Sequence, residues 1–112
     1  MMNFELNNNE LMAIIKKYYV ENHGLDVEVQ IKDRTCGDIY YGTSYEKRAD
    51  ITQKINVFGL DKLATETLDM GDIETILNKS IDNDYTVKSL NCFKGKLSID
   101  FDIKSKKRIR TL

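Results

Sequence analysis

Apolar residues recur at helical spacing in two stretches of the chain, and each stretch follows the same kind of start signal. Within residues 6–11, Asn7 is placed to cap a helix and Glu10 to close a capping box. Sixty-two residues later, Asp69 and Asp72 take the same places. The apolar stripe behind each signal keeps one spacing, with Leu11, Ile14 and Ile15 in the first and Ile73, Ile76 and Leu77 in the second. The pattern predicts two equivalent helices.

Both predicted helices end at stop signals and lead into strand-like sequence. The first should end near Asn22, before Gly24, and the second near Ile81, before a polar turn. Apolar and polar residues then alternate, as in half-buried strands, over residues 27–31, 49–57, 85–92 and 97–103. The third of these segments changes phase, which predicts a bulge near Ser89.

The order helix, strand, strand occurs twice and predicts an α+β fold. The most economical closure is an α-β-β-α-β-β two-layer sandwich, in which one four-stranded antiparallel sheet carries both helices on one face, with possible internal duplication. Segment 59–67 has Leu60, Leu63 and Ala64 at helical spacing, so it is predicted to be a short helical connector. The open face of the sheet would carry Glu28, Asp50, Asp100 and Asp102. A sheet edge could also pair with a second copy, so a dimer is possible.

The two halves differ most in their hairpins. The second turns tightly at residues 93–96, whereas the first is predicted to contain a long loop over residues 33–44. Tyrosines gather in and just after this stretch, and exposed tyrosines on a loop are typical of contact surfaces. The predicted partner-binding residues are Asp38, Tyr40, Tyr41 and Tyr45. The alternative is that the strands simply extend further, with Tyr41 and Tyr45 covering the sheet edge.

Charge is distributed unevenly along the 112 residues, whose net charge is −1. Residues 1–103 are expected to form a single domain, and residues 104–112 a basic C-terminal tail. The tail holds five cations and no anion: Lys104, Lys106, Lys107, Arg108 and Arg110. The rest has 12 Lys and Arg against 18 Asp and Glu, a net charge of −6. The acidic body suits a basic protein surface, whereas the tail could bind nucleic acid by neutralising phosphates.

Few residues suggest chemistry. Cys36 and Cys92 lack metal-ligand spacing and are expected to be reduced thiols, and His23, the only histidine, falls at a helix end. No glycine loop for a nucleotide is present, so neither metal nor cofactor is expected. No apolar stretch reaches membrane-spanning length, which predicts a cytoplasmic protein without membrane contact.

One alternative is catalytic. Asp100, Asp102 and Lys104 alternate along one predicted strand, a spacing that resembles half of the metal-dependent nuclease motif. The same spacing is also usual on the solvent-facing side of any strand.

The opening FELNNNELMAIIKKYYVENHGLDVEVQI, rich in Asn, Lys, Ile and Tyr, resembles the small accessory proteins of phages and mobile elements of AT-rich Gram-positive bacteria. Anti-CRISPR proteins are among them, and some block host defence nucleases by occupying nucleic-acid-binding clefts with an acidic surface. The resemblance implies a non-enzymatic, protein-binding inhibitor whose partner is a host protein or ribonucleoprotein complex. The alternatives are a nucleic-acid-binding accessory protein acting through its tail and a metal-dependent nuclease.

Overall fold

The computed structural model describes residues 2–38 and 42–104 and contains helices and antiparallel strands, as expected for the α+β class. In chain order the elements are β1 (Met2–Asn7), α1 (Asn8–His23), β2 (Glu28–Asp38), β3 (Gly42–Val57), β4 (Leu60–Leu68), α2 (Met70–Ser80), β5 (Tyr85–Phe93) and β6 (Lys96–Ile103).

Both helices begin at the predicted capping boxes. The Asn7 side chain accepts a hydrogen bond from the Glu10 N–H at 2.8 Å, and the Glu10 carboxylate accepts one from the Asn7 N–H at 2.9 Å. Asp69 and Asp72 make the same reciprocal pair at 2.9 and 3.1 Å. The first helix ends at Gly24, whose φ of 65° is the left-handed conformation that closes many helices. These predictions are confirmed.

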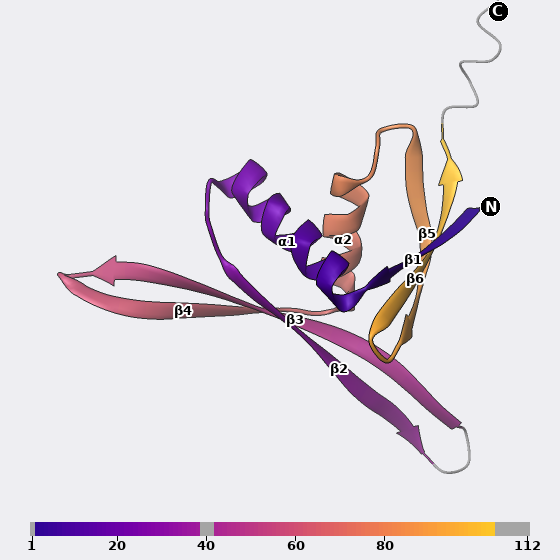
Figure 1. The fold of residues 1–112 in the computed structure, drawn as a ribbon, viewed down its shortest axis with the longest axis horizontal. Coiled ribbons are helices and arrows are strands. Elements are labelled where there is room, and N and C mark those ends of the chain that lie inside the picture. The colour runs from indigo at the N-terminus through magenta and orange to yellow at the C-terminus, as the bar shows by residue number, and fades with distance from the viewer. Residues whose placement is uncertain (1, 39–41, 105–112) are drawn as a thin grey trace, which may run out of the picture.

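The strands form two separate three-stranded antiparallel sheets, ordered β1-β6-β5 and β2-β3-β4 (Figure 1). The predicted single four-stranded sheet is therefore wrong. The predicted element order is also incomplete, because a strand precedes each helix and the true order is β-α-β-β twice. In each sheet the added strand pairs with the last strand of a hairpin: β1 with β6, and β4 with β3.

The two added strands occupy equivalent places in the fold. Leu6 of β1 lies opposite Leu97, and Leu68 of β4 lies opposite Ala49, with all four side chains buried. The prediction of a helical connector over 59–67 is wrong, since this segment is mostly strand β4. The predicted bulge in β5 is confirmed by a register shift between Val87 and Ser89.

A cluster of hydrogen bonds around the buried Lys47 joins the two sheets. The Lys47 ammonium, on β3, donates hydrogen bonds to the Asp33 carboxylate, to the Asn8 side chain at 3.0 Å and to the Phe93 carbonyl at 3.0 Å. Asp33 also accepts the Gly95 N–H at 2.9 Å, so the turn of the β5–β6 hairpin is tied to the other sheet. All three ammonium protons therefore have acceptors, as a buried lysine requires.

Strand β3 is long enough to extend past the helices in both directions. It pairs with β2 over residues 42–52 and with β4 over residues 49–57. Two ribbons result, here named the β2–β3 arm (residues 34–38 and 42–46) and the β3–β4 arm (residues 53–64) (Figure 1). The molecule measures 61 × 48 × 18 Å, and its radius of gyration of 17.2 Å exceeds the roughly 13 Å of a compact 100-residue domain.

Candidate protein-contact surface

The β3–β4 arm turns through Phe58 and Gly59, whose φ angles are 53° and 81°. Because Val57 pairs with Leu60, the loop has two residues, both with positive φ, as in a type I′ turn. Such a turn matches the twist of the ribbon and normally takes Asn followed by Gly. Phe58, an aromatic residue, is therefore unusual at the first position of this turn. Its side chain points away from the domain into solvent.

Large apolar side chains along this arm face solvent. Phe58 is 99% exposed, Leu63 72% and Leu60 58%. The pairs Val57–Leu60 and Ile55–Lys62 lie on the same side of the ribbon as buried Ile51. On that side the Tyr19 hydroxyl of helix α1 donates a hydrogen bond to Glu66 at 3.4 Å. Leu60 therefore lies on the same side of the sheet as the buried core, whereas Leu63, which pairs with Lys54, lies on the opposite side.

The described part of the predicted site, residues 34–38 and 42–45, lies on the other arm. Asp38 is the last residue of β2, Tyr45 lies opposite Thr35 in the ladder with 36% of its surface exposed, and Tyr40 and Tyr41 fall outside the described residues. The expectation of a long loop is wrong for 33–38 and 42–44, because extended strands occupy those positions. Strands β2 and β3 continue through this stretch, although its glycine and polar residues are typical of a loop.

The acidic residues expected on one open face are divided between the two sheets. Asp50 lies on β3 and accepts from Lys32 at 2.9 Å, whereas Asp100 lies on β6 and accepts from Asn3 at 2.7 Å and Ser89 at 2.8 Å. Hydrogen bonds from Asn3 and Ser89 lower the pKa of Asp100 below its ordinary value. The prediction of one shared acidic face is therefore wrong, because it required all these strands to belong to a single sheet.

The nuclease alternative requires a group of metal-ligating side chains, and the described part of the chain contains none. Within residues 2–38 and 42–104, no three His, Cys, Asp or Glu side chains are grouped to hold an ion. Asp102 lies 3.9 Å from the Lys88 ammonium. Cys36 and Cys92 form no disulfide, and the His23 ring packs beside two tyrosines of α1.

The basic tail is described only at its first residue. The Lys104 N–H donates to the Asp84 carbonyl at 2.9 Å, just after the end of β6. The other four cations, Lys106, Lys107, Arg108 and Arg110, lie outside the described residues. Over the described ranges, neither helix has the length and apolar character needed to cross a lipid bilayer.

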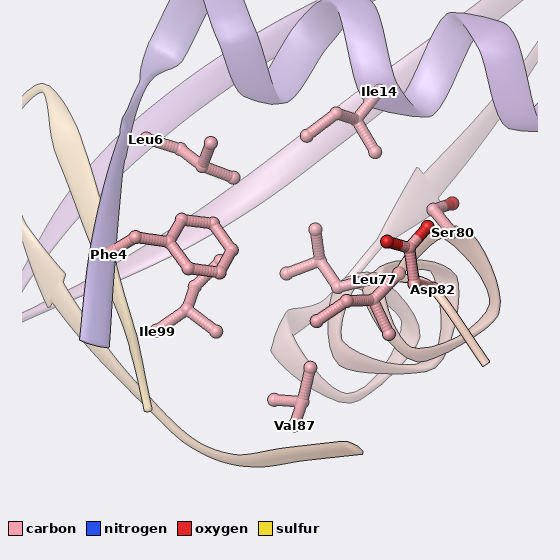
Figure 2. Close-up of a pocket in the computed structure, with 9 residues that line it drawn as sticks. Phe4, Leu6, Ile14, Leu77, Ser80, Asp82, Val87 and Ile99 are labelled. Carbon is pink, nitrogen blue, oxygen red and sulfur yellow. The ribbon is translucent and has the colours of Figure 1, made fainter. Parts of the chain in front are cut away.

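A cavity lies between the C-terminal end of α2 and the β1-β6-β5 sheet (Figure 2). This cavity has a volume of about 280 Å³ and opens to solvent. Its walls are mostly apolar, with Phe4, Leu6, Ile14, Leu77, Val87 and Ile99 among them. Ser80 and Asp82 also line the cavity and contribute polar side chains to it (Figure 2).

Comparison with profiles of known families, with curated proteins and with solved structures gave no match. The exposed arm was missed from the sequence because Leu60 and Leu63 fit a helical spacing. The signal that could have located it is Gly59 directly after the alternating segment 49–57, with apolar Val57 and Leu60 on either side of the turn.

Proposed function

We propose that this chain is a non-enzymatic protein-binding module that contacts its partner through the β3–β4 arm. The observation that carries the proposal is Phe58, a 99% exposed aromatic side chain at the tip of a defined hairpin turn. Exposed apolar side chains are common one at a time, but a projecting group of them is typical of an interaction site.

Folding alone gives little reason for Phe58 to be where it is. Left-handed backbone conformation costs a non-glycine residue about 1–3 kcal/mol. Because the Phe58 side chain is almost wholly in solvent, its burial does not offset this cost in the free chain. Burying a phenylalanine against a partner, by contrast, contributes about 1.5–3 kcal/mol. A contact made in a complex would explain both the residue and its conformation.

The polar residues of the arm suit the rim of an interface. Lys54 and Asp61 lie 3.4 Å apart and both are more than half exposed, so their ion pair contributes little to folding. Both lie on the Leu63 side of the ribbon, and Lys62 lies on the Leu60 side, so each face of the arm carries an exposed apolar side chain next to charged residues. Protein interfaces commonly combine apolar side chains with charged residues at their edge.

The resemblance to phage accessory proteins bears on the partner rather than on the surface. It implies an inhibitor of a host defence or regulatory complex, and the −6 body is compatible with a basic site on such a partner. This role remains a prediction.

Affinity capture with paired variants tests the proposal. Phe58→Ser with Leu63→Ser removes the two most exposed large apolar side chains of the arm, and should lower the yield of a stoichiometric partner at least tenfold without loss of folding. Val20→Ser, at a helix position that is 52% exposed, is the matched control and should leave capture unchanged. Equal capture by the arm variant and the control would contradict the proposal.

A further inference from the structure

The two halves of the chain place equivalent residues at a constant offset. The pairs Leu6 and Leu68, Leu11 and Ile73, Ile14 and Ile76, and Ile15 and Leu77 are each 62 residues apart. Each pair occupies the same kind of position, on the strand before a helix or on the helix itself. Seven of these eight side chains are buried, and Ile14 is partly buried against the same core. A site in one half therefore has a counterpart in the other, and the two can be compared.

One of the two counterpart sites includes an aromatic side chain of the chain itself. Tyr19, on α1, lines a smaller hollow of about 200 Å³ together with Leu68 of β4 and Ile76 of α2. Only 8% of Tyr19 is exposed, and its hydroxyl donates to Glu66 at 3.4 Å. This half therefore holds a phenol ring between a strand and two helices, with a carboxylate at the hydroxyl.

The other counterpart site is the cavity of about 280 Å³ shown in Figure 2. Counting 62 residues from Tyr19 leads to Ile81, and α2 ends one residue earlier, at Ser80. Ile81 lines the cavity together with Leu6 and Ile14, the counterparts of Leu68 and Ile76. The smaller side chain and the earlier helix end leave a larger opening here, about 280 Å³ against about 200 Å³ beside Tyr19.

We propose that this cavity is a binding site for one phenol-like aromatic ring, taken from outside the chain. Apolar cavities of about 150 Å³ already accept benzene, so the volume here suffices for a ring with a substituent. Phe4 replaces Glu66 at the strand position, so the hydroxyl acceptor must come from elsewhere, and the Asp82 carboxylate at the rim supplies it. The ring could be free in solution or belong to a tyrosine of another protein. The proposal is independent of the β3–β4 arm.

Methyl-detected NMR titration with p-cresol tests the site directly. Saturable shifts are expected at Leu77, Val87 and Ile99. Ile81→Tyr should fill the cavity with the chain's own ring and weaken p-cresol binding at least tenfold. Asp82→Asn should weaken p-cresol several-fold while leaving toluene unchanged, because toluene has no hydroxyl to donate.

The counterpart site provides the matched control. Tyr19→Ile should open a second cavity, so that p-cresol binds with a stoichiometry of two and raises the melting temperature of this variant more than that of the unaltered chain. If Tyr19→Ile does not fold, the comparison of Ile81→Tyr with the unaltered chain still decides. An Ala-Tyr-Ala peptide that binds as well as p-cresol would identify a protein tyrosine as the source, and a peptide that does not bind would identify a free phenol. Absence of p-cresol binding, or equal binding by Ile81→Tyr, would overturn the proposal.

Discussion

At position 58 the residue type does not suit the backbone conformation that the turn requires. Phe58 has a φ of 53°, in a turn where Asn is the favoured residue, and its ring contributes almost no burial. By contrast, the cap residues Asn7 and Asp69 have local preferences that agree with their positions. The caps could therefore be predicted from the sequence, because the residues that decide them are neighbours along the chain. The conformation of Phe58 could not be predicted in this way, since its own preference argues against it.

Phe58→Asn should stabilise the fold. Asn adopts the left-handed conformation more readily, so the free energy of unfolding should rise by about 1 kcal/mol. Urea denaturation followed by circular dichroism measures the change. Phe58→Ala is the control, because it removes the ring without adding a left-handed preference. An Asn variant no more stable than the Ala variant would show that the turn carries no strain.

At the scale of elements, the strands that sequence patterns miss are those that bury the least. All of β4 except Leu68 is exposed, and so is all of β1 except Leu6. A strand of this kind has no alternation between a buried and an exposed side for the sequence to record. Strands in which buried and less buried residues alternate, such as β6, are predictable for the opposite reason. The division into two sheets also depends on pairing β1 with β6, near opposite ends of the chain, which no local pattern specifies.

Shortening the β3–β4 arm should separate folding from binding. Replacing residues 54–63 by Asn-Gly retains the Gln53–Ala64 pair and closes it with a favoured turn. Because the removed residues bury little, the free energy of unfolding should change by no more than about 1 kcal/mol. Capture of the partner should be lost. A shortened chain that still captures the partner would show that the contact lies elsewhere, with Tyr45 on the β2–β3 arm the first position to examine.

At the scale of the whole molecule, polar contacts hold the two sheets together across the halves. Asp33 and Lys47 belong to one sheet, whereas the Phe93 carbonyl and the Gly95 N–H belong to the turn of the other. The Lys47 side chain is fully buried. A buried lysine would not be inferred from sequence, where Lys47 is one of several charged residues in a row. The arrangement makes the junction sensitive to the ionisation of Asp33.

The stability of the junction should depend on pH in the acid range. Burial acts to raise the pKa of Asp33, but hydrogen bonds from Lys47, Gly95 and Asn8 outweigh it and lower the pKa below the usual value. A carboxyl with a lowered pKa stabilises the fold above its unfolded-state pKa, near 4, and this contribution is lost as pH falls through the lower folded-state value. Urea unfolding measured from pH 7 to pH 2 should show the loss.

Variants separate this effect from general acid sensitivity. Asp33→Asn should lower the free energy of unfolding at pH 7 by about 3–5 kcal/mol, because Lys47 remains buried without its counter-charge, and should flatten the acid dependence. Asp61→Asn removes an exposed carboxylate paired with Lys54 and should change little. Equal effects from the two variants would contradict a structural role for the junction.

Site-specific photo-crosslinking tests most directly whether this molecule acts through the tip of its β3–β4 arm. A photoreactive phenylalanine analogue would be placed, one at a time, at positions 58, 45 and 20, and the protein irradiated in cells of its native host. We predict a single crosslinked partner protein from position 58, with none from the exposed helix position 20. A crosslink from position 45 but not from 58, or equal labelling from 58 and 20, would contradict the account.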